Sequence, residues 1–198
     1  LVGMGLYFSF LGMTDFVEAP RGAGYGFDAT ILQASLLFLM PGALSAAATT
    51  LIGGRCIERF GARAVVAGGG LVGVVGFLML AGWHDTRWEV MVAGVLTNAY
   101  ISLAYGALPA LIVSEVDHSE TGVATSLNGT FRKVGGAAAA ALVGALLTPR
   151  SGGLAAESGF TAVFVLGAAT AAGSVLLVWL GRERSAARRL GPTIPLRR

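Results

Sequence analysis

The chain has 198 residues, of which 55% are hydrophobic and 13% charged, and its formal net charge is +3. Soluble domains carry about a quarter of charged residues, so this composition excludes an ordinary water-soluble protein and places the chain in a bilayer. The 30 glycines have no collagen-like period and stand inside apolar runs, where small residues let membrane helices approach closely.

Six apolar stretches follow one another, each close to the roughly 20 residues that a helix needs to cross a bilayer. The predicted spans are residues 1–17, 30–52, 64–82, 90–113, 123–148 and 160–181. Pro41 and Gly42 predict a kink in the second span. Gly69 and Gly73 in the third span predict the close approach of another helix. We therefore expect an all-α integral membrane protein with a transmembrane domain over residues 1–181.

Basic residues are unevenly distributed over the connections between these spans. Three arginines lie in the connection 54–63 and six in the tail 182–198, and both segments fall on the same side of the predicted membrane domain. Lys and Arg concentrate on the cytoplasmic side of membrane proteins. We therefore expect a multi-pass plasma-membrane protein with both termini and the basic tail in the cytoplasm.

Residues that commonly bind metals are few and isolated. Cys56 is the only cysteine, so the chain can form no internal disulfide and no cysteine-based metal site. His84 and His118 lie between apolar runs, and we expect them to be solvated loop residues. The acidic residues of the connection 114–122 are expected to interact with the dipole of the following helix rather than with a metal.

Enzymatic chemistry has no visible basis in the sequence. No nucleophile, base and orienting group stand together, and no phosphate-binding loop or metal-ligand spacing is present. The chain is predicted not to be an enzyme, to need no cofactor and to bind no nucleic acid.

Polar side chains lie mainly in the first, fourth and fifth spans, whereas the third and sixth have almost none. Since a polar group facing lipid is costly, the first three are expected to line a path and the other two to be peripheral. The candidate residues are Tyr7, Asp15, Asn98, Ser102, Tyr105, Asn128 and Arg132.

Two interpretations stay open for these residues. Asn98, Ser102 and Tyr105 share one helical face, which either hydrogen-bonds neighbouring helices and the backbone freed by Pro109 or forms part of a substrate cavity. Arg132 lies about 14 Å along its helix from the start of the span, and either reaches back to the membrane surface or acts as a gate or cavity residue. Asp15 is either simply solvent-exposed or part of the same cavity.

The connection 54–63 carries the pattern Gly-x-x-x-acid-Arg-x-Gly-x-Arg. The residues at its fixed positions are Gly54, Glu58, Arg59, Gly61 and Arg63. Together with the six spans, this pattern resembles one half of a major facilitator superfamily transporter, whose loop motif usually reads Gly-x-Leu-x-Asp-Arg-x-Gly-Arg-Arg. Glu58, Cys56 and Ala62 depart from that motif. Such weakened copies are typical of the family's C-terminal half, so the resemblance implies that the chain is that half.

Two other segments resemble one branch of this family. Residues 122–147, which read Gly-Val-Ala-Thr-Ser-Leu-Asn-Gly-Thr-Phe-Arg-Lys-Val-Gly-Gly before an alanine-rich run, are similar to the penultimate span of the fourteen-span drug and proton antiporters. The loop ending in residues 24–27, Gly-Tyr-Gly-Phe, also looks like that branch.

The resemblance implies an architecture and a working part. It implies two inverted three-helix repeats, which form half of a major facilitator fold, with substrate bound between this half and a missing N-terminal six-helix half. It also implies that Glu58, Arg59 and Arg63 form a conformational latch and that Gly54 and Gly61 make the turn. The alternative is a loop whose positive charge only fixes the topology.

The function implied is proton-coupled export of drug-like or hydrophobic small molecules by alternating access, with the proton gradient as the energy source. The partners are then the lipid bilayer, a small-molecule substrate and the missing half. The alternative is a truncated, non-transporting membrane protein, or a half-transporter subunit that needs a partner.

Overall fold

The computed structural model describes residues 1–117, 119–149 and 154–189, with side chains up to residue 181. Every regular element in this part of the chain is helical. The α-helices are α1 (Val2–Glu18), α2 (Ile31–Gln33), α3 (Met40–Phe60), α4 (Ala62–Gly82), α5 (Arg87–Val113), α6 (Thr121–Leu147) and α7 (Glu157–Arg189). A short 3-10 helix, η1 (Arg21–Ala23), follows α1, and a π-helix, η2 (Ala34–Leu39), joins α2 to α3.

Most of these helices match the thickness of a bilayer. Five helical segments are long and apolar enough to cross one, namely Ile31–Phe60, Ala62–Gly82, Arg87–Val113, Thr121–Leu147 and Glu157–Gly181. α1 has 17 residues and spans about 26 Å at about 1.5 Å per residue, slightly less than a hydrocarbon core of about 30 Å. These are the helices of a multi-pass membrane protein, as the composition predicts.

The second predicted span is longer than expected, and the charged connection is not a loop. α2, η2 and α3 run without interruption from residue 31 to residue 60, so residues 54–60 form the last turns of α3. The chain turns at Gly61 alone, whose φ of 83° and ψ of 151° are rarely adopted by other residues. Arg and Glu are good helix formers, and this preference extends the helix to Phe60. The predicted turn at Gly54 is therefore wrong.

The irregularity predicted at Pro41 and Gly42 takes the form of the π-helix that precedes them. Proline has no N–H to donate, and its ring crowds the carbonyl one turn earlier. The wider turns of η2 lie over the residues that would face this crowding. At the start of the segment, Thr30 and Gln33 form a capping box in which each side chain accepts a hydrogen bond from the other's backbone N–H at 3.3 Å.

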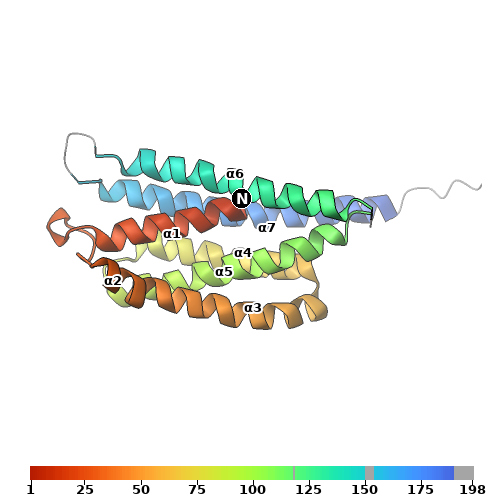
Figure 1. Ribbon diagram of the computed structural model, residues 1–198, viewed down its shortest axis with the longest axis horizontal. Coiled ribbons are helices and arrows are strands. Elements are labelled where there is room, and N and C mark those ends of the chain that lie inside the picture. Colours follow the sequence, from red (N-terminus) through yellow and green to blue (C-terminus); the bar gives the residue numbers. More distant parts are fainter. Residues whose placement is uncertain (118, 150–153, 190–198) are drawn as a thin grey trace, which may run out of the picture.

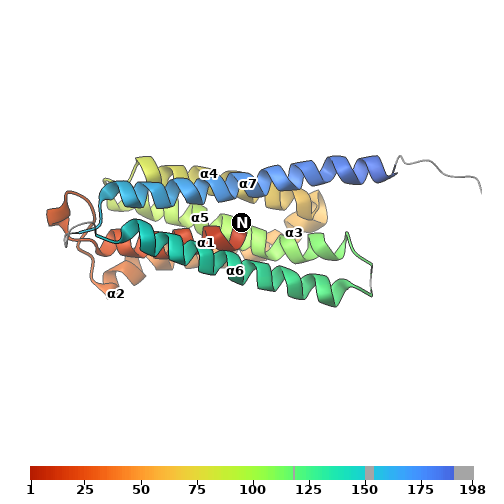
Figure 2. The same ribbon diagram turned by 90° about the horizontal axis from the view of Figure 1, so that it is seen from above.

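The helices form two layers (Figures 1 and 2). α3, α5, α1 and α6 lie side by side in that order, and α4 and α7 pack together across α5 and α1. The predicted close approach in the third span is present, because a Cβ on Gly73 of α4 would lie 2.5 Å from the ring of Tyr100 on α5. Small residues thus draw the two layers together.

The side of the four-helix layer opposite α4 and α7 is covered by no other described helix, and we call it the open face. On α5 it is the side opposite Tyr100, and on α1 the side opposite Gly12, which contacts Val163 and Phe164 of α7. Its residues on these two helices are Tyr7, Phe10, Asn98, Ser102 and Tyr105. Tyr7 and Phe10 are 40% and 51% exposed, so a large apolar area of α1 faces outward here.

One end of the bundle is closed by aromatic rings, and we call it the aromatic end. The buried Phe16 of α1 lies at its centre, with ring centroids 5.1–6.2 Å from those of Tyr25, Phe27, His84, Phe160 and Phe164. The loop after α1 folds back over this cluster, because Asp28 N donates to Ala19 O at 2.9 Å and Ala29 N to Val17 O at 3.0 Å.

Candidate functional site

A cavity of about 160 Å³ lies between α1, the second helical segment and α5. Its lining residues are Leu6, Ser9, Phe10, Met13, Leu39, Ala43, Asn98 and Ile101. Only Ser9 and Asn98 bring polar side chains to it. The Ser9 hydroxyl lies 2.9 Å from that of Thr97, and the Asn98 amide donates to Gly94 O at 2.9 Å. The cavity is therefore mainly apolar, with polar groups whose positions are fixed by hydrogen bonds.

The residues of the polar face on α5 make different contacts. Ser102 joins helices, because its hydroxyl donates to Ala46 O at 2.8 Å and lies 2.7 Å from the hydroxyl of Thr50 on α3. Asn98 lines the cavity, although its amide donor is used within its own helix. A second contact from α3, Ser45 to Val95 O at 3.1 Å, strengthens the same seam.

Tyr105, the third residue of that face, lies beneath Arg132 of α6. The guanidinium carbon is 4.2 Å from the centroid of the tyrosine ring, which is the geometry of a cation–π interaction. Arg132 thus extends from α6 toward α5. Tyr7 completes this region, since a Cβ on Gly136 of α6 would lie 2.5 Å from its ring.

The remaining candidates lie apart from the cavity between α1 and α5. Asn128 lines a separate cavity of about 190 Å³ with Arg132 and Leu1. Asp15 is exposed near the end of α1 that joins the aromatic end. A cavity of about 500 Å³ on the side of α4 and α7 is lined by apolar residues and Arg63, and it contains none of the candidates from the spans. The structure thus brings Tyr7, Tyr105 and Arg132 together and places Asp15 apart from these three residues.

The opposite end of the bundle carries charged residues, and we call it the arginine end. Its defining residues are Arg59, Arg63 and Glu115. Arg63 Nη2 lies 2.6 Å from Glu115 Oε1, and this pair joins the start of α4 to the chain just after α5. Arg59 lies with its guanidinium carbon 5.4 Å from the ring centroid of its neighbour Phe60. Glu58 is exposed on the last turn of α3.

The structure corrects the expectation for Gly54 and adds a contact at Glu115. Gly54 is helical, with open space where a Cβ would stand, so it has no role in the turn. The interaction of Glu115 with the dipole of the next helix stays a prediction, and the structure adds an ion pair between Glu115 and Arg63. Sequence reasoning missed this pair because 52 positions separate its members.

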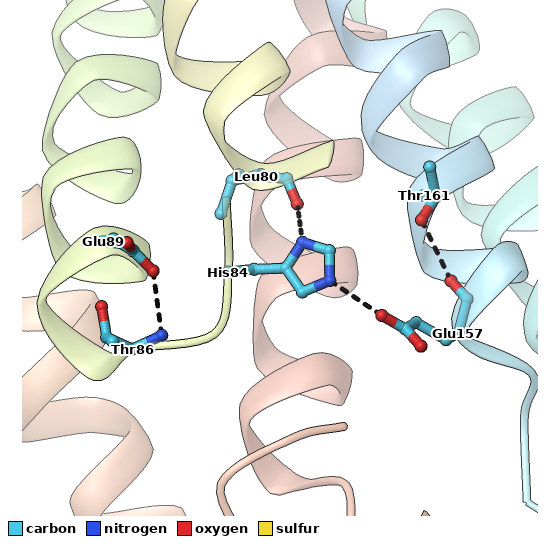
Figure 3. Close-up of polar contacts among 6 residues, drawn as sticks. All are labelled: Leu80, His84, Thr86, Glu89, Glu157 and Thr161. Atoms are coloured by element: carbon cyan, nitrogen blue, oxygen red, sulfur yellow. Dashed lines mark hydrogen bonds and ion pairs between the residues drawn. The ribbon is translucent and has the colours of Figure 1, made fainter. Parts of the chain in front are cut away.

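His84 at the aromatic end is not the solvated residue that the sequence predicts. Its Nδ1 lies 2.9 Å from Leu80 O and its Nε2 lies 3.1 Å from Glu157 Oε1, as Figure 3 shows. The side chain is only 12% exposed, because α4 ends at Gly82 and the turn folds the ring against Phe16. His118, for which the same prediction was made, lies outside the described residues.

Tyr25 ties the loop after α1 to the chain before α7. Its hydroxyl donates to Ala155 O. Burial and, to a smaller extent, the nearby Glu157 carboxylate raise the pKa of Tyr25 above its ordinary value. In the part of the chain that the structure describes, no three His, Cys, Asp or Glu side chains come together as metal ligands.

Comparison with known proteins gives a family for this arrangement. A family model described as the Major Facilitator Superfamily matches residues 1–197. No curated protein and no solved structure matches the chain. The family consists of membrane transporters rather than enzymes, and its model covers almost every residue of this bundle of apolar helices. The chain therefore belongs to the major facilitator superfamily.

Proposed function

We propose that this chain is the C-terminal half of a secondary active transporter that exports drug-like or hydrophobic small molecules in exchange for protons. The observation that carries the proposal is the open face with its apolar cavity of about 160 Å³. Pockets for drug-sized molecules measure about 300–1,000 Å³, so this cavity is one wall of a larger site. The second wall is a six-helix N-terminal half packed against the open face.

The lining of the cavity supports a weakly polar substrate. Phe10, Met13 and Ile101 offer apolar surface, while Ser9 and Asn98 offer a few fixed polar groups. Such a lining binds hydrophobic compounds through burial and orients them through a small number of hydrogen bonds. Arg132 on the Tyr105 ring places a positive charge beside α5, where it acts as a gate.

The same proposal includes two inverted three-helix repeats. The first repeat contains α1, the segment from α2 to α3, and α4, and the second contains α5, α6 and α7. The packing supports this division, because α3 of the first repeat packs on α5, α6 of the second packs on α1, and α4 packs on α7. The middle helix of each repeat thus packs against the first helix of the other repeat.

In the proposed alternating-access mechanism, the arginine end acts as a conformational latch. The excess of arginines in residues 54–63 and in the tail supports placing this end in the cytoplasm. Glu58, Arg59 and Arg63 are proposed as the conformational latch, with Gly61 as the turn that fixes their positions. The ion pair from Arg63 to Glu115 then holds one conformation together from within this half.

The test uses the complete gene product in inverted membrane vesicles. Fluorescent hydrophobic dyes should accumulate when a proton gradient is imposed, and an uncoupler should abolish the accumulation. Asn98→Ala should lower the rate several-fold, whereas Leu176→Ala, at an outward-facing position on α7 that is 59% exposed, should leave it unchanged. Accumulation insensitive to the uncoupler would sink proton coupling. Absence of any transport would favour a non-transporting membrane protein or a subunit that needs a partner.

A further inference from the structure

At the aromatic end, a single imidazole ring lies between two oxygen atoms of different helices. One is the carbonyl of Leu80 in α4, 2.9 Å from Nδ1 of His84, and the other is a carboxyl oxygen of Glu157 in α7, 3.1 Å from Nε2. Figure 3 shows the ring bridging the end of α4 and the start of α7. A carbonyl oxygen and an ionised carboxylate can accept hydrogen bonds but cannot donate them.

The number of protons available decides whether both contacts are hydrogen bonds. A neutral imidazole carries one N–H, so it can donate to Leu80 O or to Glu157, and the other contact would then set two lone pairs against each other. One additional proton, on the ring or on the carboxyl group, turns both contacts into hydrogen bonds. We propose that His84 and Glu157 form a proton-binding site that fastens α4 to α7 when it is occupied.

The positions of the two residues relative to their helices support the charged form. His84 follows the end of α4 at Gly82, where the helix dipole favours a positive group. Glu157 is the first residue of α7, where the dipole favours a negative one. A proton at this site therefore stabilises an imidazolium and a carboxylate that both lie at favourable helix ends.

The other charged and titratable groups around the ring come from three segments. Asp85 follows His84 in the same turn, and Glu89 of α5 is close enough for the charge of His84 to act on its carboxylate. Tyr25, from the loop after α1, lies close enough to Glu157 for their charges to interact. α1 itself contributes the uncharged ring of Phe16, 5.1 Å from the imidazole. Arg87, the first residue of α5, is a basic group near the same turn.

Release of the proton has a structural consequence. Without it, one of the two contacts is lost: either the bond to Glu157 that holds the start of α7, or the bond to Leu80 O that fixes the ring at the end of α4. Tyr25 still donates to Ala155 O just before α7, so the connection stays attached to the loop after α1. The site thus changes the α4 to α7 contact specifically, and this holds whether or not the chain transports protons.

The experiment compares thermal unfolding of the full chain at about pH 5.5 and about pH 8.5. These two values lie on either side of the pH range in which an unperturbed histidine side chain changes its charge. The unfolding temperature of the wild type minus that of His84→Gln should be about 3 °C larger at the lower pH than at the higher one. Glu157→Gln should remove this pH dependence, because an amide can both donate and accept and therefore satisfies a neutral ring. Glu89→Gln, at the same end, removes a charge that acts on His84 without contacting it. It should therefore reduce the pH dependence by less than Glu157→Gln does.

A second measurement guards against variants that fail to fold. In a His118→Gln chain His84 is the only histidine, and ¹⁵N-labelled histidine reports its ring nitrogens directly. At about pH 5.5 both N–H protons should exchange slowly with water, and Glu157→Ala should expose the Nε2 proton alone. Equal stability differences at both pH values, or fast exchange at Nε2 in the chain that retains Glu157, would overturn the proposal.

Discussion

The aromatic end of the bundle is held by packed rings, whereas the arginine end is held by charged side chains that remain partly exposed. At the aromatic end Phe16, which is 1% exposed, contacts rings from α7, from the loop after α1 and from the turn after α4. At the arginine end the Arg63 and Glu115 side chains are 30% and 47% exposed.

This difference teaches which end can rearrange at low cost. Packed rings lose burial and ring contacts together when they separate. An exposed ion pair exchanges its partner for water or for another charge at a cost of about 1 kcal/mol or less. The aromatic end is therefore the more rigid end of this bundle, and the arginine end is the one that can form and break contacts at low cost.

The largest expected effect comes from removing the ring at the centre of the aromatic end. Phe16→Ala should lower the free energy of unfolding by about 3–5 kcal/mol, because it leaves a cavity among five other rings. Phe10→Ala, on the exposed side of the same helix, should cost less than about 1 kcal/mol. Denaturation in detergent, followed by near-ultraviolet circular dichroism, measures both. Equal losses would mean that the aromatic cluster does not hold this end.

The next effect distinguishes two glycines at the arginine end. Gly61→Ala should cost about 1–3 kcal/mol, because alanine is strained at a φ of 83°. Gly54→Ala, within α3, should be neutral or stabilising by up to about 1 kcal/mol, because alanine favours a helix and finds open space there. Thermal unfolding of both variants shows which substitution costs more stability. A larger loss for Gly54→Ala than for Gly61→Ala would indicate that the chain turns at Gly54.

A smaller effect is expected where the loop after α1 is tied to the chain before α7. Tyr25→Phe should cost about 1 kcal/mol, because it removes the hydrogen bond to Ala155 O. Since the pKa of Tyr25 is raised in the folded chain, the wild type keeps this contribution below about pH 10 and loses it as the pH rises further. The wild type should therefore be more stable than Tyr25→Phe at pH 8, and the two proteins should be about equally stable at pH 11. A stability difference that is the same at both pH values would argue against the contact.

The smallest effect concerns the ion pair of the arginine end. A double-mutant cycle with Arg63→Ala and Glu115→Ala should give a coupling of about 0.2–1 kcal/mol, which high salt should screen. The exchanged pair, Arg63→Glu with Glu115→Arg, should recover part of the loss seen in either reversal alone. A coupling above about 2 kcal/mol would make the arginine end as firmly held as the aromatic end.

Local patterns in the sequence were enough to predict much of the fold. Long apolar runs mark the helices, and Gly61 marks the turn between α3 and α4. Pro41 predicts an irregular helix, although only the structure shows that it is the π-helix η2. The continuation of α3 to Phe60 was missed, because charge suggested a loop where helix propensity prevails.

The candidate site was less predictable, because its contacts are long-range. The spacing of Asn98, Ser102 and Tyr105 places them on one face, but it does not reveal that Ser102 bonds to α3 and Tyr105 to Arg132. The pair of His84 and Glu157 spans 73 positions of the sequence and leaves no local pattern. Periodicity predicts which way a side chain points, and only packing decides what it meets.

The central claim is that the open face is one wall of a transport path, and thiol labelling tests it most directly. In the gene product with its native cysteines replaced, Asn98→Cys should react with a membrane-impermeant maleimide and be protected by a transported dye. Leu176→Cys, which is exposed on α7 in the lining of the apolar cavity of about 500 Å³, should stay unlabelled because the account expects this side to face lipid. An unreactive Asn98→Cys, or labelling of it that the dye leaves unchanged, would contradict the account.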